Sequence, residues 1–177
     1  YSNKDNCFHY ITTMNQNYLQ PPMPEGVKEG IIKGVYLLKE TSDSDLKVQL
    51  MGAGTILLEI IEAAKLLESE YSIGADIWSL TSVNELVREG QAVSRWNMLH
   101  PKEEPRLSYL ESLTVNKEGP TIIATDYIKN YAEQLRGYVR LPLHVLGTDG
   151  FGRSDSRKAL RNFFEVDRYF IVLAALK

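Results

Sequence analysis

The sequence contains one cysteine in 177 residues, Cys7, and this scarcity excludes two kinds of site. A lone thiol forms no internal disulfide, and a zinc site built on several cysteines has no ligands here. Long apolar runs are also missing. No apolar run approaches the roughly 20 residues that span a bilayer. No charged segment followed by an apolar one opens the chain, as a secretion signal would. These absences predict a cytoplasmic protein without a membrane segment.

An excess of basic residues is absent as well. Twenty Lys and Arg residues stand against twenty-three Asp and Glu residues, for a net charge of −3. Proteins that bind nucleic acids normally carry a basic excess or a concentrated basic stripe. The basic cluster of this chain contains Arg153, Arg157, Lys158 and Arg161, with Asp155 among them. We interpret it as the hydrated face of a helix in preference to a phosphate contact, and we expect no nucleic-acid partner.

The composition that remains is globular, with 44% apolar and 24% charged residues. The length suits one domain whose core needs no disulfide or metal. Pro21, Pro22 and Pro24 hold the backbone extended near the start and exclude a helix there. We therefore divide the chain into an extended arm or linker from a preceding domain, 1–26, and a domain, 27–177, that is truncated within its last helical run.

From residue 30 onward, short apolar strands alternate with amphipathic helices. The predicted strands are 31–39, 47–51, 75–80, 121–125 and 144–148. The predicted helices are 55–71, 84–100, 128–135, 154–165 and 166–176, with Ser154 or Asp155 as the cap of the fourth. In the first of these helices the polar residues form one stripe: Glu59, Glu62, Lys65 and Ser69. Such alternation is typical of a mostly parallel sheet covered on both faces, so we predict a three-layer α/β/α domain.

Two glycines between a strand and a helix, Gly52 and Gly54, are compatible with a dinucleotide-binding turn. Leu57 occupies the position of the third glycine in that motif, and Asp76 lies at the start of the next strand instead of at its carboxyl end. We therefore favour a tight strand-to-helix turn that binds no ligand.

Three predicted strands end in hydroxyl or carboxylate residues, which are Thr81-Ser82, Thr125-Asp126 and Thr148-Asp149. In a parallel sheet these residues lie along the carboxyl edge, where α/β proteins usually bind ligands. The same residue types also cap the helices that follow, which is the interpretation we favour. A stand-alone nucleotide- or anion-binding module that uses Gly52, Gly54, Asp126 and Asp149 stays open as the alternative.

Histidine offers no metal site, because His9, His100 and His144 are far apart in the sequence and no pair has ligand spacing. A catalytic pair of Cys7 and His9 lacks a third group that would orient it. From the residues alone we predict no catalytic, cofactor-binding or metal-binding residue in this chain.

Longer strings are more specific than any of these single motifs. They are YITTMNQNY at 10–18, VQLMGAG at 48–54, DIWSLTS at 76–82, RWNMLHP at 95–101 and LGTDGFGRSDSR at 146–157. Taken together, they resemble the carboxyl-terminal domain of the homodimeric bacterial pyruvate dehydrogenases, which belong to the transketolase-like family. The resemblance implies a five-stranded mixed sheet between helices, in which the first strand, 31–39, is antiparallel.

The resemblance also implies chemistry for a parent enzyme. It implies thiamine diphosphate and Mg²⁺ as cofactors, pyruvate as the substrate, and transfer of a two-carbon fragment to a lipoyl group on dihydrolipoyl acetyltransferase. The cofactor motif of the family begins with Gly-Asp-Gly, which this sequence lacks. The glutamate that activates the cofactor belongs to the preceding domain. We therefore expect this part alone to be inactive and to bind no cofactor.

The resemblance implies that this chain has a supporting role for neighbouring parts of the enzyme. We expect contacts with the preceding domains of the same chain or with the second subunit of a homodimer. The candidate contact residues are Phe8, Tyr10 and Tyr18 in the arm and Asp126, Asp149, Phe151 and Arg153 at the carboxyl rim.

Overall fold

The computed structural model describes residues 6, 8–11, 13–41 and 44–177. Cys7 lies outside these residues, so the predicted absence of a Cys7–His9 pair is not tested. The elements, in chain order, are α1 (Lys28–Lys33), β1 (Val35–Lys39), β2 (Lys47–Ala53), the 3₁₀ turn η1 (Gly54–Ile56), α2 (Leu57–Tyr71), β3 (Gly74–Leu80), α3 (Val83–Leu99), α4 (Tyr109–Thr114), β4 (Thr121–Ala124), α5 (Lys129–Glu133), the 3₁₀ turn η2 (Arg136–Tyr138), β5 (Leu143–Leu146), α6 (Arg157–Phe163) and α7 (Arg168–Leu176).

The strands form one five-stranded sheet in the order β1-β3-β2-β4-β5. Strand β1 runs antiparallel to β3, and the other neighbours are parallel. The chain moves from β2 to β3 on one side and then crosses to β4 on the other side of β2. The point between β2 and β4 is therefore the switch point of the topology, where open α/β sheets usually bind ligands.

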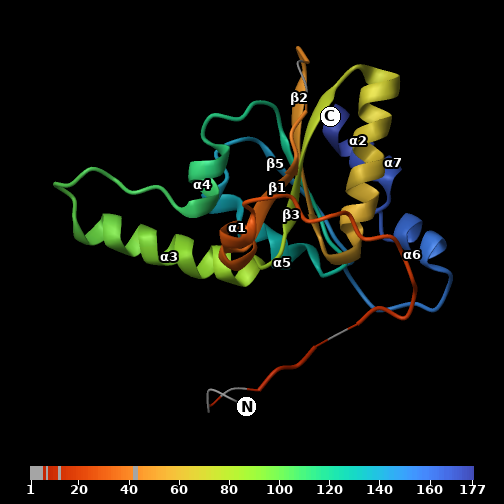
Figure 1. Ribbon diagram of the computed structural model, residues 1–177, viewed down its shortest axis with the longest axis horizontal. Helices are drawn as coiled ribbons and strands as arrows, with labels where there is room; N and C mark the ends of the chain where they lie inside the picture. Colours follow the sequence, from red (N-terminus) through yellow and green to blue (C-terminus); the bar gives the residue numbers. More distant parts are fainter. Residues whose placement is uncertain (1–5, 7, 12, 42–43) are drawn as a thin grey trace.

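Two apolar clusters cover the two faces of the sheet and confirm the three-layer prediction. Helices α2 and α7 pack on one face, around Ile60, Leu67 and Ile171. Helices α3, α4 and α5 pack on the other face, around Met51, Leu86 and Leu110. Figure 1 shows the sheet nearly edge-on between α2 and α7 on one side and α3, α4 and α5 on the other.

The prediction of a strand over 31–39 is wrong in its first part. Residues Lys28–Lys33 form α1, and only Val35–Lys39 form β1. Gly34 separates them with a φ of 107°, a left-handed conformation that ends a helix and favours glycine. The backbone N–H groups of Thr81 and Ser82 donate to the Gly34 carbonyl, which joins this turn to the end of β3. The apolar character of 31–32 concealed a short helix.

Other boundaries move by a few residues. Ser156 is the cap of α6, not Ser154 or Asp155, because its side chain accepts from the Ala159 N–H. The predicted helix 128–135 is shorter and continues as the turn η2. Helix α4, within the predicted loop 101–118, begins with a capping box in which Ser108 and Glu111 satisfy each other's backbone N–H groups.

Before Val27 the described residues form neither helix nor strand, and the division into an arm, 1–26, and a domain stays a prediction. No helix among the described residues is long and apolar enough to cross a membrane. Figure 1 shows the arm passing beside α6 before it turns back to α1.

Candidate functional site

The carboxyl edge of the sheet brings the predicted strand-end residues to one side of the domain, and most of them bond the backbone. Ser82 caps α3 by accepting from the Glu85 N–H. Asp149 accepts from the Lys129 N–H at 2.9 Å and so caps α5 from a neighbouring loop. The Thr148 hydroxyl donates to the Asp126 carbonyl at 2.6 Å. The capping interpretation is therefore confirmed for Ser82 and wrong for Asp149, which binds the start of the preceding helix α5 instead of the helix that follows it. Asp126 caps no helix.

Gly52 and Gly54 serve the turn from β2 into α2. A Cβ atom at position 52 would lie 2.7 Å from the Leu57 Cα, so only glycine allows this approach of strand and helix. Gly54 has a φ of 59°, which turns the chain into η1. These observations favour the tight turn. The set Gly52, Gly54, Asp126 and Asp149 does not line one cavity, so the stand-alone binding module is not supported.

Two hollows lie along this edge, and residues of the arm line both of them. One, of about 340 Å³, opens beside α6, and the other, of about 480 Å³, opens over the ends of β2 and β3. Met14, Thr55 and Asp126 line both hollows. Tyr18, a predicted contact residue, is half-buried and lines the second hollow. The arm thus covers part of the edge where a ligand would be expected.

The predicted hydrated helix face is wrong for Arg161, which pairs with a buried carboxylate, and for Arg153, which lies before the helix, whereas α6 itself buries none of its residues. Arg161 pairs with buried Glu59 at 2.8 Å. The Arg157 guanidinium donates to the side-chain oxygens of Asn15 and Gln16 in the arm. Arg153 precedes α6 and lies 4.1 Å from the centre of the Phe163 ring. Only Lys158 is an exposed helix residue with no such contact among the described residues.

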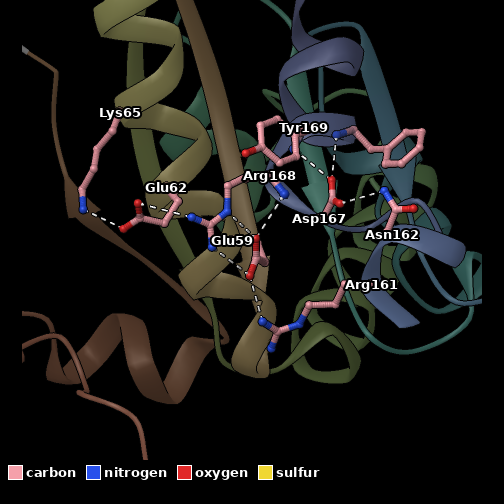
Figure 2. Close-up of polar contacts among 9 residues, drawn as sticks. Glu59, Glu62, Lys65, Arg161, Asn162, Asp167, Arg168 and Tyr169 are labelled. Atoms are coloured by element: carbon pink, nitrogen blue, oxygen red, sulfur yellow. Dashed lines mark hydrogen bonds and ion pairs between the residues drawn. The ribbon is translucent and has the colours of Figure 1, made fainter. Parts of the chain in front are cut away.

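Glu59 is the centre of a buried ion cluster, which Figure 2 shows between α2 and the C-terminal helices. Its residue exposure is 5%, although the sequence placed it on the polar stripe of its helix. Arg168 donates to it from Nε at 2.9 Å and from its backbone N–H at 3.2 Å, and Arg161 donates from the other side. Burial alone would raise the pKa of the Glu59 carboxyl, but the Arg168 hydrogen bonds and the charges of Arg168 and Arg161 hold that pKa below its ordinary value.

The cluster fixes the C-terminal segment to α2. Arg168 also reaches Glu62 at 3.6 Å, and Glu62 bonds Lys65 at 2.6 Å. Asp167 begins α7 by accepting from two backbone N–H groups, those of Tyr169 and Phe170. Since α6 and α7 are held in this way, Leu160 and Phe164 form a wall of the smaller hollow.

A second buried carboxylate, Asp76, lies at the opposite, amino edge of the sheet and is 2% exposed. It accepts from the Thr41 N–H at 2.8 Å and from the Gln49 amide at 3.2 Å, and it pairs with Lys117 at 3.1 Å. The Gln49 side chain also accepts from the Trp78 indole at 2.9 Å. Burial lowers the pKa of the Lys117 ammonium, but the partners Glu40 and Asp76 outweigh it and raise that pKa.

Sequence reasoning missed the roles of two buried polar residues, Glu59 and Asp76. The first was assigned to the polar stripe of its helix, and the second was considered only as the acidic residue of a dinucleotide-binding motif. The arginines within 157–168 were visible as possible partners of Glu59. However, no rule of sequence spacing predicts a contact between residues more than a hundred positions apart.

The histidines form no site. The ring of His100 stacks on Trp96 with ring centres 4.3 Å apart, and its Nδ1 lies 2.8 Å from the Trp96 carbonyl oxygen. Among the described residues, no three His, Cys, Asp or Glu side chains gather where they could hold a metal ion.

The remaining predicted contact residues are exposed. Phe8 is 92%, Tyr10 87% and Phe151 95% exposed, so three large aromatic side chains lie in water on the arm and the rim. Asp126 is also exposed. Nothing in the described part of the chain covers these rings.

Comparison with known proteins gives curated relatives at high identity. A protein named pyruvate dehydrogenase E1 component from Pseudomonas aeruginosa is 58% identical over 176 residues, which are 98% of this chain and 20% of that protein. The protein of the same name from Escherichia coli K12 is 52% identical over 174 residues, 98% of this chain and 19% of that protein. The chain thus spans about a fifth of the length of these relatives.

Solved structures and a family model agree on the fold. A transketolase from Campylobacter jejuni has a TM-score of 0.55 at 21% identity, over 81% of this chain and 18% of that chain. A structure described as a split-gene transketolase, an inactive beta4 tetramer, also has a TM-score of 0.55, at 19% identity over 81% of this chain and 41% of that chain. The model of the transketolase-like TK C-terminal domain matches residues 34–167. The chain therefore belongs to the transketolase-like C-terminal domain family.

Proposed function

We propose that this chain is the C-terminal domain of a pyruvate dehydrogenase E1 component. The complete enzyme would act in the cytoplasm, decarboxylate pyruvate with thiamine diphosphate and Mg²⁺, and pass the two-carbon fragment to the lipoyl group of dihydrolipoyl acetyltransferase. The observation that carries the proposal is the 58% identity to a protein of that name over 98% of this chain. The alignment includes the arm as well as the domain.

The residues of this chain do not fit the cofactor and its metal ion. Mg²⁺ takes oxygen ligands in octahedral geometry, together with phosphate oxygens of the substrate or cofactor. The sequence has no Gly-Asp-Gly, and the described residues bring no three His, Cys, Asp or Glu side chains together where they could hold a metal ion. In the proposed enzyme, the chemistry belongs to the part of the protein outside this chain, and this domain supports it.

The proposed support acts through the arm and the rim. Phe8, Tyr10 and Phe151 expose their rings, and burial of an aromatic ring in an interface is worth a few kcal/mol, on the order of 2. We propose that these rings contact the preceding domains or the second subunit of a homodimer. Contacts through Tyr18, Asp126, Asp149 and Arg153 stay predictions of the same proposal.

A graft tests the proposed function. This chain would replace the matching residues of the Pseudomonas aeruginosa protein, and turnover of pyruvate and the mass of the assembly would be measured. We expect the grafted enzyme to turn over pyruvate, and the same protein without the segment to lose activity. A graft that is folded but inactive, or turnover of pyruvate by the 177-residue chain alone, would contradict the proposal.

Serine substitutions in the graft test the contact surface. Replacing Phe8, Tyr10 and Phe151 together should weaken the assembly and lower turnover, while Tyr71→Ser, which removes a half-exposed ring at the end of α2, serves as the matched control. Unchanged mass and turnover in the triple variant would refute the contact role and leave the family assignment intact.

A further inference from the structure

The smaller hollow lies at the switch point of the sheet. Thr55 lines it from the turn after β2 and Asp126 from the turn after β4, which are the two strands that flank the switch point. Open α/β sheets bind ligands in this crevice. Its volume of about 340 Å³ falls within the range of small-molecule sites, which begins at roughly 300 Å³.

The charge of this hollow is positive. Arg153, Arg157 and Arg161 line it, and Asp126 is the carboxylate among its lining residues. Arg161 is matched by Glu59. Within the described ranges neither Arg153 nor Arg157 is paired with a carboxylate, so two arginines face one aspartate. A guanidinium binds carboxylate and phosphate oxygens through two parallel hydrogen bonds.

The hollow is bordered by a largely buried polar side chain and by apolar walls. Thr55 lines it and is 8% exposed. The walls beside it are apolar and consist of Ile56, Leu160, Phe164 and Val166. A ligand that suits these walls and the two arginines has an apolar body and an anionic end.

The arm already bonds Arg157, one of the two arginines of the hollow that pair with no carboxylate among the described residues. Asn15 and Gln16 bind the Arg157 guanidinium through neutral amide oxygens, and Met14 lines the opening. Hydrogen bonds between a guanidinium and an anion are about twice as strong as those between neutral groups, so an anion would compete well for Arg157. Binding there would detach residues 14–16 from α6.

We propose that the hollow between α6 and the switch point of the sheet binds a small organic anion, held by Arg153 and Arg157 against an apolar wall, and that the anion competes with Asn15 and Gln16 of the arm. The ligand class is a carboxylate or a phosphate monoester with a compact apolar body. The hollow shares Asp126 with the unsupported glycine-based module but is not lined by Gly52, Gly54 or Asp149, and the proposal does not depend on the proposed enzymatic activity.

Two probes and one neutral analogue test the proposal on the 177-residue chain. Phenyl phosphate and benzoate carry the two anionic ends, and benzyl alcohol has the same ring without charge. Calorimetry gives the affinities, and amide chemical shifts of Thr55 and Ile56 locate the binding. We expect at least one anion to bind and to shift these amides, and benzyl alcohol to bind at least about tenfold more weakly.

Variants separate the arginines from general charge. Arg157→Gln should weaken the anion at least about tenfold, and Lys158→Gln, the next residue on α6, should leave affinity unchanged. Replacing Asn15 and Gln16 with Ala should tighten binding, because Arg157 loses its competitors. The thermal midpoint of each variant verifies its fold.

Three results would overturn the proposal. They are no binding of either anion in the millimolar range, equal affinity for benzyl alcohol, and equal losses in Arg157→Gln and Lys158→Gln. Preference for phenyl phosphate over benzoate, or the reverse, decides between the two anionic ends.

Discussion

Two buried carboxylates, Asp76 and Glu59, have nearly the same exposure and opposite surroundings. Asp76 lies at the amino edge of the sheet and is held by one ammonium, one amide and one backbone N–H. Glu59 lies on α2 and is held by two guanidinium groups from the C-terminal segment. All partners of Asp76 belong to residues 41–117, whereas those of Glu59 lie at 161 and 168.

The difference indicates two roles. The contacts of Asp76 stabilise the central part of the domain, whereas the contacts of Glu59 attach the C-terminal helices to it. Loss of Asp76 would remove a buried acceptor that connects Thr41, Gln49 and Lys117 at the amino edge of the central sheet. Loss of Glu59 would leave two arginines that already touch solvent, with side-chain exposures of 22% and 36%. Breaking the first should lower the stability of the whole domain, and breaking the second should mainly release α6 and α7.

The largest effect is expected for Asp76→Ala. The variant leaves the Thr41 N–H without its acceptor and takes one of two acceptors from Lys117, which keeps Glu40, and from the Gln49 amide, which keeps a backbone carbonyl. We expect the free energy of unfolding to fall by about 4 kcal/mol. Urea denaturation measures it. Asp45→Ala, at an exposed position, is the matched control and should change stability by less than about 0.5 kcal/mol. Equal losses in both variants would show that the network contributes nothing.

A smaller loss, about 3 kcal/mol, is expected for Glu59→Gln at neutral pH. The amide removes the charge that both arginines face while it keeps the size of the side chain. Hydrogen exchange of the α7 amides should accelerate more than exchange of the β2 and β3 amides. Uniform acceleration in all of these elements would contradict a local role for Glu59.

The stability difference between Glu59→Gln and the parent chain should depend on pH. The folded-state pKa of Glu59 lies below its ordinary value, so the carboxylate contributes stability that is complete above the unfolded pKa, about 4.3. That contribution disappears as the pH falls through the folded pKa. Unfolding measured from pH 7 downward should show the two curves converge in acid. A constant difference would exclude the ion cluster as its cause.

A still smaller effect distinguishes the two arginines. Arg168 contacts Glu59 through Nε, Nη2 and its backbone N–H, and it also reaches Glu62. Arg168→Lys loses this fork and should cost about 1.5 kcal/mol. Arg161→Lys loses one contact and should cost less than about 1 kcal/mol. The reverse order in urea denaturation would assign the main contact to Arg161.

The smallest effect belongs to the carboxyl edge. Asp149→Ala removes the cap of α5 and should cost about 1 kcal/mol. Asp126→Ala, a neighbouring exposed aspartate that caps no helix, should leave the thermal midpoint unchanged. If both variants lose the same stability, the capping role of Asp149 is wrong.

Much of the fold was predictable because short apolar runs and polar stripes repeat at strand and helix periods. The parallel strands and α2, α3 and α7 follow from such runs. The strand predicted at 31–39 failed because Ile31 and Ile32 are apolar in either state, and only the left-handed Gly34 divides helix from strand. The antiparallel direction of β1 came from the resemblance and is confirmed by its pairing with β3.

The polar contacts were far less predictable. A helix stripe of Glu59, Glu62, Lys65 and Ser69 has the period of a hydrated face, and nothing local shows that its first residue is buried under α7. The arginines of α6 look like surface charges for the same reason. Both assignments depend on pairings across more than a hundred residues, which period and spacing do not encode.

The Glu59 cluster has a consequence for synthesis on the ribosome. Glu59 is made 102 residues before Arg161 and 109 before Arg168. At about 5–20 residues per second, the carboxylate waits about 5–20 s for its partners. During that time Val166, Ile171 and Val172 are also missing from the apolar face beneath α2. The nascent domain therefore exposes the part of this sheet face that α7 covers until α7 emerges, and a chaperone would bind there.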